Sequence, residues 1–279
     1  MNILKIAAFS YQAKGGNPAG VVFSDFMPAA EEMLEIAKQV GYSETAFLVQ
    51  HADGWRVRYF APEMEVPFCG HATIASGAAL GERLGEGTYK FYLNQGEISV
   101  SAEKAVNGIF TATLQSPETW SRDAPEEYVD KILAAFNLEK DSLDPEFPTC
   151  FAFAGAKHLI LAVKDRKTLA DMNYQFDLVK SLMADENLIT ISILWRESDE
   201  LFHSRNAFAS GGVYEDPATG AAAAALAGYL RDINWQGKKA FTILQGEDMG
   251  MSSRLLVEYS SKTGESVSVS GEVRHIFDN

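Results

Sequence analysis

An internal repeat constrains this chain more than any other feature of its sequence. A shift of 150 positions aligns residues 65–97 with residues 215–247 without a gap, and eleven of the 33 aligned positions are identical. About two identities are expected between unrelated sequences of ordinary composition. The matches include the tripeptide Gln-Gly-Glu at 95–97 and 245–247, which a shared richness in alanine does not explain. The repeat indicates one internal duplication and predicts two related lobes.

The repeated segment has the pattern of a loop, a helix, a turn and a strand. Small residues follow Gly70 and Gly220, which favours a helix packed closely on all sides and central in its lobe. Apolar periodicity predicts further helices at 29–40, 125–136 and 176–185. Alternating or apolar runs predict strands at 3–10, 19–23, 46–50, 55–60, 88–93, 98–102, 108–114, 150–153, 158–163, 188–194, 201–206, 239–244, 255–259 and 266–276. We predict an α+β fold of two pseudo-symmetric, barrel-like lobes, each a curved mixed or antiparallel β-sheet around a central helix.

A polar stretch with two prolines, residues 115–125, is the best candidate for a linker between the lobes. It predicts an N-terminal lobe at 1–117 and a C-terminal lobe at 118–265, with the strand at about 266–279 as a candidate to complete the first lobe. The two lobes are then expected to face each other across a cleft.

Charge and cysteine content exclude several classes of partner. Lys and Arg number 24 against 38 Asp and Glu, so the net charge is −14, which disfavours nucleic acid and anionic membranes. Two cysteines make neither a disulfide framework nor a four-ligand zinc site, and they suit a reducing compartment. The start of the chain does not resemble a signal peptide, and the apolar stretch at 218–230 is too short to span a membrane. We expect a cytoplasmic protein without a membrane partner.

The usual cofactor motifs are missing from the sequence. No Gly-x-Gly-x-x-Gly follows a predicted strand, and no Gly-x-x-x-x-Gly-Lys-Ser/Thr occurs. The histidines are scattered and form no pair or His/Cys cluster with metal-ligand spacing. We therefore predict chemistry that uses neither a cofactor nor a metal ion.

Two glycine turns precede the two repeated helices, and they are the candidate substrate site. The exposed amides and the dipole of a helix N-terminus favour an anion, so the paired turns predict a site for a carboxylated ligand. Cys69-Gly70-His71-Ala72-Thr73 forms the first turn, and Asp216-Pro217-Ala218-Thr219-Gly220-Ala221 forms the second. The candidate substrate-binding residues are Tyr11, Asn17, Ser43, Gly70, Thr73, Thr219, Gly220 and Ala221. Tyr11, Asn17 and Ser43 have ordinary loop roles as an alternative.

Four motifs in order over nearly the whole chain resemble the phenazine-biosynthesis PhzF-like isomerase family. They are Gly16-Asn17-Pro18-Ala19, Gly41-Tyr42-Ser43-Glu44-Thr45-Ala46-Phe47, Phe60-Ala61-Pro62 with Glu65-Val66-Pro67-Phe68-Cys69-Gly70-His71-Ala72-Thr73, and Glu215-Asp216-Pro217-Ala218-Thr219-Gly220. The resemblance implies a fold similar to diaminopimelate epimerase, with the active site between two lobes. It also implies that Glu44 is the general acid/base, and that His71 and Asp216 bind substrate or assist proton transfer.

The residues themselves leave each of these roles open. Glu44 leads into an apolar strand, where desolvation would raise its pKa, but an exposed loop glutamate or a helix cap is the alternative. His71 can be a structural histidine, and Asp216 can be a capping residue before a proline.

Two departures from the family pattern concern the substrate. Ala221 stands where many relatives have serine, and Met251-Ser252-Ser253 replaces an arginine-containing segment after Gly250.

The leading functional hypothesis is an isomerase that moves a proton within a small carboxylated metabolite, without metal or cofactor. One alternative is a thiol-dependent racemase or epimerase that uses Cys69, although Pro217 occupies the place expected for the second thiol. Another is a catalytically silent protein that binds a metabolite or a partner in the same cleft. A homodimer is the candidate assembly, and the natural substrate is not evident from the sequence.

Overall fold

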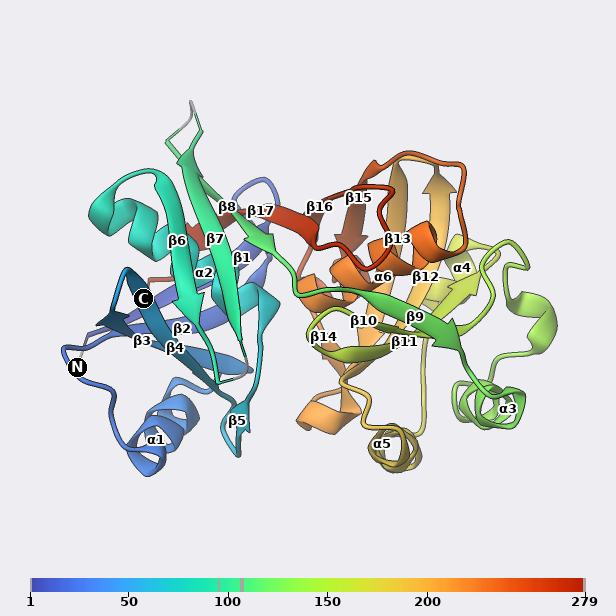
Figure 1. Cartoon of the computed structure of the whole chain (residues 1–279). Helices are drawn as coiled ribbons and strands as arrows, with labels where there is room; N and C mark the ends of the chain where they lie inside the picture. The colour runs from blue at the N-terminus through green and yellow to red at the C-terminus, as the bar shows by residue number, and fades with distance from the viewer. Residues whose placement is uncertain (1, 95, 106–107, 278–279) are drawn as a thin grey trace. The chain divides into compact units, whose positions relative to one another are not determined.

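The computed structural model describes residues 2–94, 96–105 and 108–277 (Figure 1). The chain divides into two compact units, Met1–Gln115 with Met251–Arg254 and Ser268–Asn279, and Ser116–Gly250 with Leu255–Val267. The lobe boundaries that the sequence suggests, 1–117 and 118–265, stay a prediction. Gln95 of the repeated tripeptide and residues 278–279 of the predicted C-terminal segment lie outside the described residues.

The first unit is an eight-stranded barrel that closes on itself. Following the hydrogen-bonded neighbours, the strands run β1, β17, β8, β7, β6, β4, β3, β2 and back to β1. The pairs β2–β3 and β4–β6 are parallel and the other pairs are antiparallel. The short β5 pairs with β4 outside this ring. The strands are β1 (Ile3–Ser10), β2 (Asn17–Phe23), β3 (Glu44–His51), β4 (Gly54–Phe60), β5 (Glu65–Val66), β6 (Gly87–Tyr92), β7 (Glu97–Lys104), β8 (Phe110–Gln115) and β17 (Val267–His275).

Helix α2 (Gly70–Leu84) occupies the centre of this barrel, and every residue from Gly70 to Gly81 is buried. Small side chains allow this close packing: a Cβ atom on Gly77 would lie 2.4 Å from a methyl carbon of Val100 in β7. Helix α1 (Ala30–Val40) lies outside and buries Met33 and Ala37 against Phe47 and Phe60. The predicted central helix is thus confirmed.

The second unit repeats the same order of pairings. Its successive strand pairs are antiparallel, parallel, antiparallel and parallel for β10–β11, β11–β12, β12–β13 and β13–β15. The first unit has the same order for β1–β2, β2–β3, β3–β4 and β4–β6. The strands are β9 (Trp120–Asp123), β10 (Cys150–Phe153), β11 (Lys157–Val163), β12 (Thr190–Ser198), β13 (Leu201–Ala207), β14 (Glu215–Asp216), β15 (Ala240–Gln245) and β16 (Ser253–Tyr259). The helices are α3 (Glu126–Ala135), α4 (Arg166–Ala170), α5 (Phe176–Asp185) and α6 (Gly220–Asp232).

Helix α6 is the counterpart of α2 and begins 150 residues later. Its residues from Gly220 to Arg231 are buried, and it contacts β9, β10 and β11 (Figure 1). On the other face of the sheet, α3 and α5 cover an apolar cluster that includes Phe151 and Leu161. The fold is α+β, as the sequence predicts, with curved sheets and one central helix in each unit.

The predicted linker at 115–125 is partly wrong. Residues Trp120–Asp123 form β9, which pairs antiparallel with β10, and the Trp120 ring stacks on Phe153 at a centroid distance of 5.3 Å. Polar residues are tolerated here because β9 pairs on one side only among the pairings described. The Trp120–Asp123 part of the stretch therefore belongs to the sheet of the second unit.

A search of the described helices finds none with the length and apolar character that a membrane span requires. The cytoplasmic location stays a prediction.

Candidate active site

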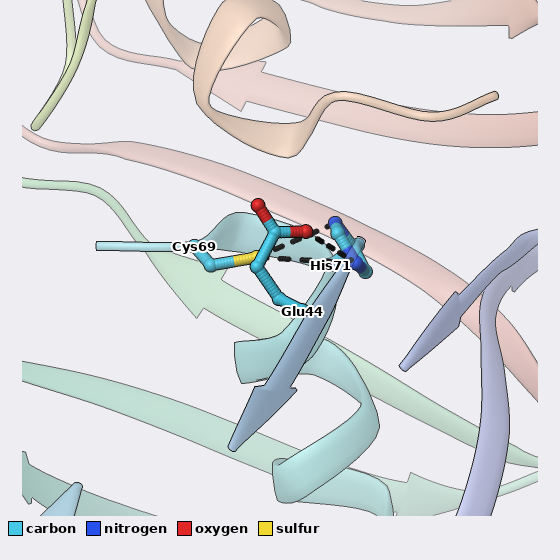
Figure 2. A group of neighbouring side chains, drawn as sticks. All are labelled: Glu44, Cys69 and His71. Atoms are coloured by element: carbon cyan, nitrogen blue, oxygen red, sulfur yellow. Dashed lines mark hydrogen bonds and ion pairs between the residues drawn. The ribbon is translucent and has the colours of Figure 1, made fainter. Parts of the chain in front are cut away.

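The buried start of β3 and the first turn of α2 bring together Glu44, Cys69 and His71 (Figure 2). Glu44 is the first residue of β3, which lies parallel to β2 and places Glu44 beside Ala19. Cys69 is the N-cap residue of α2, and His71 lies in its first turn. Because β3 and the start of α2 belong to the same barrel, residues far apart in the sequence meet. We call these three residues and Ser43 the Glu44 cluster.

Short distances connect the side chains of the Glu44 cluster. His71 Nε2 lies 3.3 Å from Glu44 Oε2 and 3.3 Å from Ser43 Oγ. Cys69 Sγ lies 3.4 Å from His71 Nδ1. Glu44 and His71 are only 6% and 4% exposed, and Oε2 has no hydrogen bond among the described residues. A buried carboxylate oxygen without a hydrogen-bond donor is uncommon and is free to accept a proton.

Burial shifts the pKa values of Glu44 and His71 in opposite directions, and each shift favours the uncharged form of the side chain. Desolvation raises the pKa of Glu44 to about 6, against the smaller opposing effect of hydrogen bonds from Ser43 and Cys69. Desolvation lowers the pKa of His71 to about 3, against a hydrogen bond to the Pro18 carbonyl that favours the charged ring. At neutral pH the imidazole is therefore uncharged, so His71 does not reduce the basicity of Glu44. A carboxylate with this pKa is a suitable general base.

The N-terminus of α2 is left without a capping side chain. Cys69 has an extended backbone, its side chain makes no capping hydrogen bond, and the first turn holds no acidic residue. The first amides of a helix have no partner within the helix, so an uncapped start favours an anion. Thr73 is fully buried, and its hydroxyl donates to the Cys69 carbonyl at 2.7 Å, which holds the turn in place.

In the second unit, Asp216 lies in a separate hydrogen-bonded group at the start of α6. Its carboxylate accepts a hydrogen bond from the hydroxyl of Thr219, the N-cap residue. Gln245 donates to the Asp216 carbonyl at 2.7 Å and accepts from the Thr219 amide at 3.1 Å. The Asn206 amide nitrogen lies 3.4 Å from the same Gln245 oxygen. Gln245 therefore fixes the turn that carries Asp216.

Sequence reasoning assigned no role to Gln245 or Asn206. A signal for Gln245 was present, because it belongs to the repeated tripeptide that composition does not explain. Asn206 has no such signal: it reaches the turn through the pairing of β13 with β14, where it lies opposite Asp216.

The remaining predicted site residues are distributed over both units. Asn17 is buried at the start of β2, and Tyr11 lies in the turn after β1 with its ring 4.9 Å from the Arg254 guanidinium carbon. Gly220 and Ala221 begin α6 and are buried. The catalytic roles of Glu44, His71 and Asp216 stay predictions. So do the substrate contacts of Tyr11, Asn17, Ser43, Gly70, Thr73, Thr219, Gly220 and Ala221.

The Glu44 cluster also contains donor atoms of the types that bind metal ions. One oxygen, one sulfur and one nitrogen from Glu44, Cys69 and His71 lie within 4.8 Å of one another. Zinc accepts these ligand types. A metal ion held here would occupy the carboxylate oxygen that a general base needs. The expected absence of a metal or cofactor stays a prediction.

Fold and site together define an α+β protein with a buried cluster of a carboxyl, a thiol and an imidazole at the start of a central helix. The sequence model of the family described as phenazine biosynthesis-like protein matches residues 6–278. An uncharacterized isomerase, YfhB, from Bacillus subtilis is 30% identical over 274 residues, which cover 94% of this chain and 92% of the relative. The chain belongs to the phenazine biosynthesis-like family and is an isomerase.

Solved structures show the same fold. A PhzF-family phenazine biosynthesis protein from Bacillus anthracis matches with a TM-score of 0.84 at 23% identity, over 99% of this chain and 96% of the other. A probable proline racemase from Agrobacterium radiobacter matches with a TM-score of 0.66 at 10% identity, over 98% and 90%. The epimerase-like fold that the sequence predicts is thus confirmed.

Proposed function

We propose that this isomerase moves a proton from one carbon of a small carboxylated metabolite to another, with Glu44 as the general acid/base and without metal or cofactor. The observation that carries the proposal is the state of Glu44: its carboxyl is buried, its Oε2 has no hydrogen bond to any residue that the structure describes, and its pKa is raised to about 6. Such a carboxylate is ionised at neutral pH and more basic than an exposed one.

In the proposed reaction, the Glu44 carboxylate removes a proton from a substrate carbon and becomes a carboxylic acid. The electron pair of the broken C–H bond is delocalised into the substrate. The same carboxylic acid then returns the proton to a second carbon, so that Glu44 is a carboxylate again and the reaction needs no oxidant or reductant. His71, whose Nε2 lies 3.3 Å from Glu44 Oε2, is uncharged at neutral pH and leaves the negative charge on the carboxylate.

The uncapped N-terminus of α2 supports a carboxylated substrate. The amides of the first turn of α2, which have no partner within the helix, would bind a substrate carboxylate and hold a neighbouring carbon within reach of the base. Asp216, which the sequence resemblance assigns to the same site, remains part of the proposal as a substrate-positioning group.

The thiol-dependent racemase has less support, because the repeat supplies only one candidate thiol. The residue of the second unit that corresponds to Cys69 is Thr219. By the register of the strands, the residue of β12 that corresponds to Glu44 of β3 is Thr190. Neither corresponding residue has a thiol. The other cysteine, Cys150, is buried in β10, and desolvation raises the pKa of its thiol well above the ordinary value. A thiol held in its protonated form is a poor base.

Incubation in deuterated water with a panel of carboxylated metabolites, in the presence of EDTA, tests the proposal. We expect migration of a double bond with deuterium incorporated at the new C–H position, or direct transfer of the original hydrogen by the same carboxyl group. Inversion of a stereocentre with exchange would indicate the racemase instead. Binding without chemistry would indicate a silent protein, and loss of turnover in EDTA would contradict metal independence.

The dependence of activity on pH follows from the raised pKa of Glu44. Only the ionised form removes a proton, so we expect kcat/KM to rise with pH up to about 6 and then to level off. His71, with its pKa lowered to about 3, adds no further step between pH 5 and 8. An inflection near 4.5, the ordinary pKa of a glutamate, would contradict the assignment of a desolvated base.

Cys69→Ala separates a supporting thiol from a catalytic one. We expect this variant to keep turnover within about tenfold of wild type, because the thiol contacts Glu44 and His71 but transfers no proton in the proposed reaction. Its pH profile should shift slightly upward, since a hydrogen bond that lowers the pKa of Glu44 is lost. Inactivity of a folded Cys69→Ala protein, or alkylation of Cys69 that substrate prevents, would favour the racemase.

A further inference from the structure

The close contact between Glu44 and His71 lacks a hydrogen bond. His71 Nε2 and Glu44 Oε2 lie 3.3 Å apart, yet Oε2 has no hydrogen bond among the described residues. An uncharged imidazole has one N–H group, and the His71 ring donates a hydrogen bond to the Pro18 carbonyl. The other ring nitrogen therefore presents a lone pair. Two buried groups with unshared electron pairs lie side by side, which is the arrangement that a cation stabilises.

Cys69 adds a third atom that can bind a metal ion. Its Sγ lies 3.9 Å from His71 Nε2, and one ligand atom from each of the three residues lies within 4.8 Å of the others. Figure 2 shows the carboxyl, the thiol and the imidazole converging from β3 and the start of α2. All three residues are buried, so the backbone of one barrel fixes their positions.

The spacing of these atoms suits a tetrahedral zinc ion. Zinc lies about 2.3 Å from a thiolate sulfur and about 2.0–2.2 Å from an imidazole nitrogen or a carboxylate oxygen. Tetrahedral angles then separate the nitrogen from the oxygen by about 3.4 Å and the sulfur from the nitrogen by about 3.6 Å. The separations in the structure, 3.3 Å and 3.9 Å, are close to both values.

The ligand types select among metal ions. Magnesium and calcium require oxygen ligands, whereas a set of one sulfur, one nitrogen and one oxygen suits zinc. A metal-binding histidine usually donates its other ring N–H to a carbonyl or a carboxylate, which orients the ring. The hydrogen bond from His71 to the Pro18 carbonyl has this form.

We propose that Glu44, Cys69 and His71 bind a zinc ion and that zinc bound there inhibits the isomerase. The three residues leave the fourth position of the ion to water. Cys69 binds as the thiolate, so its proton passes to the solvent and no group is oxidised or reduced. The binding site stands on the geometry alone. The inhibition rests on the proposed function, because the ion occupies the Glu44 oxygen that would remove the proton from the substrate.

Titration of the metal-free protein with cobalt(II) tests the site without any substrate, because cobalt(II) reports on tetrahedral coordination and on sulfur ligands by its absorption. We expect one equivalent to give the visible bands of a tetrahedral ion and an ultraviolet sulfur-to-cobalt band. Added zinc should displace the cobalt and remove both. Loss of an outer partner of a metal ligand typically costs about 10–100-fold in affinity. Cys69→Ala removes a ligand itself, so it should abolish the ultraviolet band and weaken zinc binding at least about 100-fold.

Cys150→Ala is the matched control. Cys150 is the other cysteine of the chain, is only 3% exposed in β10 and is not part of the Glu44 cluster. This variant should give the same spectra and the same zinc affinity as wild type. A sulfur-to-cobalt band that persists in Cys69→Ala, or its absence from wild type, would overturn the proposed site. Cys69→Ser, whose hydroxyl is a poor zinc ligand, decides the question if Cys69→Ala does not fold.

Turnover measured with added zinc tests the inhibition separately, with the substrate that the deuterium experiment identifies. One equivalent of zinc should stop wild-type turnover, EDTA should restore it, and Cys69→Ala should resist zinc at the same concentration. If zinc binds through Cys69 but turnover continues, the inhibition and the proposed role of Glu44 are both wrong, and the metal site stands. If cobalt gives no sulfur band while Glu44→Gln is inactive, the metal site is wrong and the proposed function stands.

Discussion

Glu44→Gln is expected to reduce kcat by at least about 10²- to 10⁴-fold, the usual contribution of general acid–base catalysis. The amide preserves the size of the side chain and its place at the start of β3, but it cannot accept and return a proton. Substrate affinity should change little, because only the transition state loses an interaction. The measurement is kcat and ligand affinity on one preparation, with the substrate that the deuterium experiment identifies.

The stability of the same variant provides a second readout. The pKa of Glu44 is raised from 4.5 to about 6 in the folded protein, so the folded state favours the protonated form. The stabilising contribution of the protonated group is full below pH 4.5 and is lost as pH rises through 6. Wild type should therefore lose about 2 kcal/mol between these limits that Glu44→Gln does not lose. The variant's advantage in melting temperature should grow from pH 4 to pH 8.

Glu32→Gln serves as the control for both measurements. Glu32 is exposed in the first turn of α1, in the same unit, and its substitution should change neither kcat nor the pH dependence of stability. A Glu44→Gln enzyme within threefold of wild-type kcat would end the proposed mechanism. A pH-independent difference in melting temperature would show that Glu44 is not desolvated in solution.

The largest effect on stability is expected for Glu215→Ala. Glu215 forms a two-point ion pair with Arg205, at 3.0 Å to Nε and 2.5 Å to Nη2, and both residues are buried. Removal of one partner leaves the other charge buried and unpaired, which costs about 3–5 kcal/mol. Among the described residues, the Arg205 guanidinium then keeps hydrogen bonds to two backbone carbonyls, that of Ala170 at 2.7 Å and that of Met172 at 3.4 Å.

The first unit contains a natural control for this variant. Arg58 and Glu65 form the same two-point pair, but their side chains are 20% and 25% exposed. Glu65→Ala should cost about 1 kcal/mol or less, because water solvates the remaining arginine. Calorimetric unfolding of the two variants measures the difference. Equal destabilisation would show that burial does not govern the strength of these pairs.

The equivalence of these two pairs was not evident from the sequence, and loop length explains why. Phe60 lies opposite Glu65, and Ala207 lies opposite Glu215. Phe60 and its counterpart Ala207 are therefore 147 residues apart, whereas Glu65 and its counterpart Glu215 are 150 residues apart. The difference arises because the loop between β13 and β14 is three residues longer than the loop between β4 and β5. The ungapped repeat begins at Glu65 for this reason. Residues of the first unit that precede Glu65 are not aligned with their counterparts by a shift of 150 positions.

Periodicity predicted the long strands and the helices α1, α3 and α5 because each has one clear apolar pattern, but it missed the five-residue helix α4. It missed β5 and β14, which are two residues long and depend on pairing with distant strands. It missed β9 because Ser121, Arg122 and Asp123 are polar. The repeat pointed to the turn that carries Cys69 and His71, and the apolar strand after Glu44 suggested a raised pKa, but the catalytic role of Glu44 came from the family resemblance. The contacts of the Glu44 cluster join β3 to the start of α2, and no local pattern in the sequence predicts which of these side chains meet.

The closure of the first barrel has a consequence for how the chain is made. Strand β17 lies between β1 and β8, yet it is synthesised after the whole second unit. During synthesis on the ribosome, β1 and β8 therefore lack β17 as their partner until residues up to His275 have emerged. Contacts of such large sequence separation form slowly, and exposed edges favour association between chains. The N-terminal part of the protein thus completes its fold last, and its folding yield should be sensitive to changes near the C-terminal end of β17.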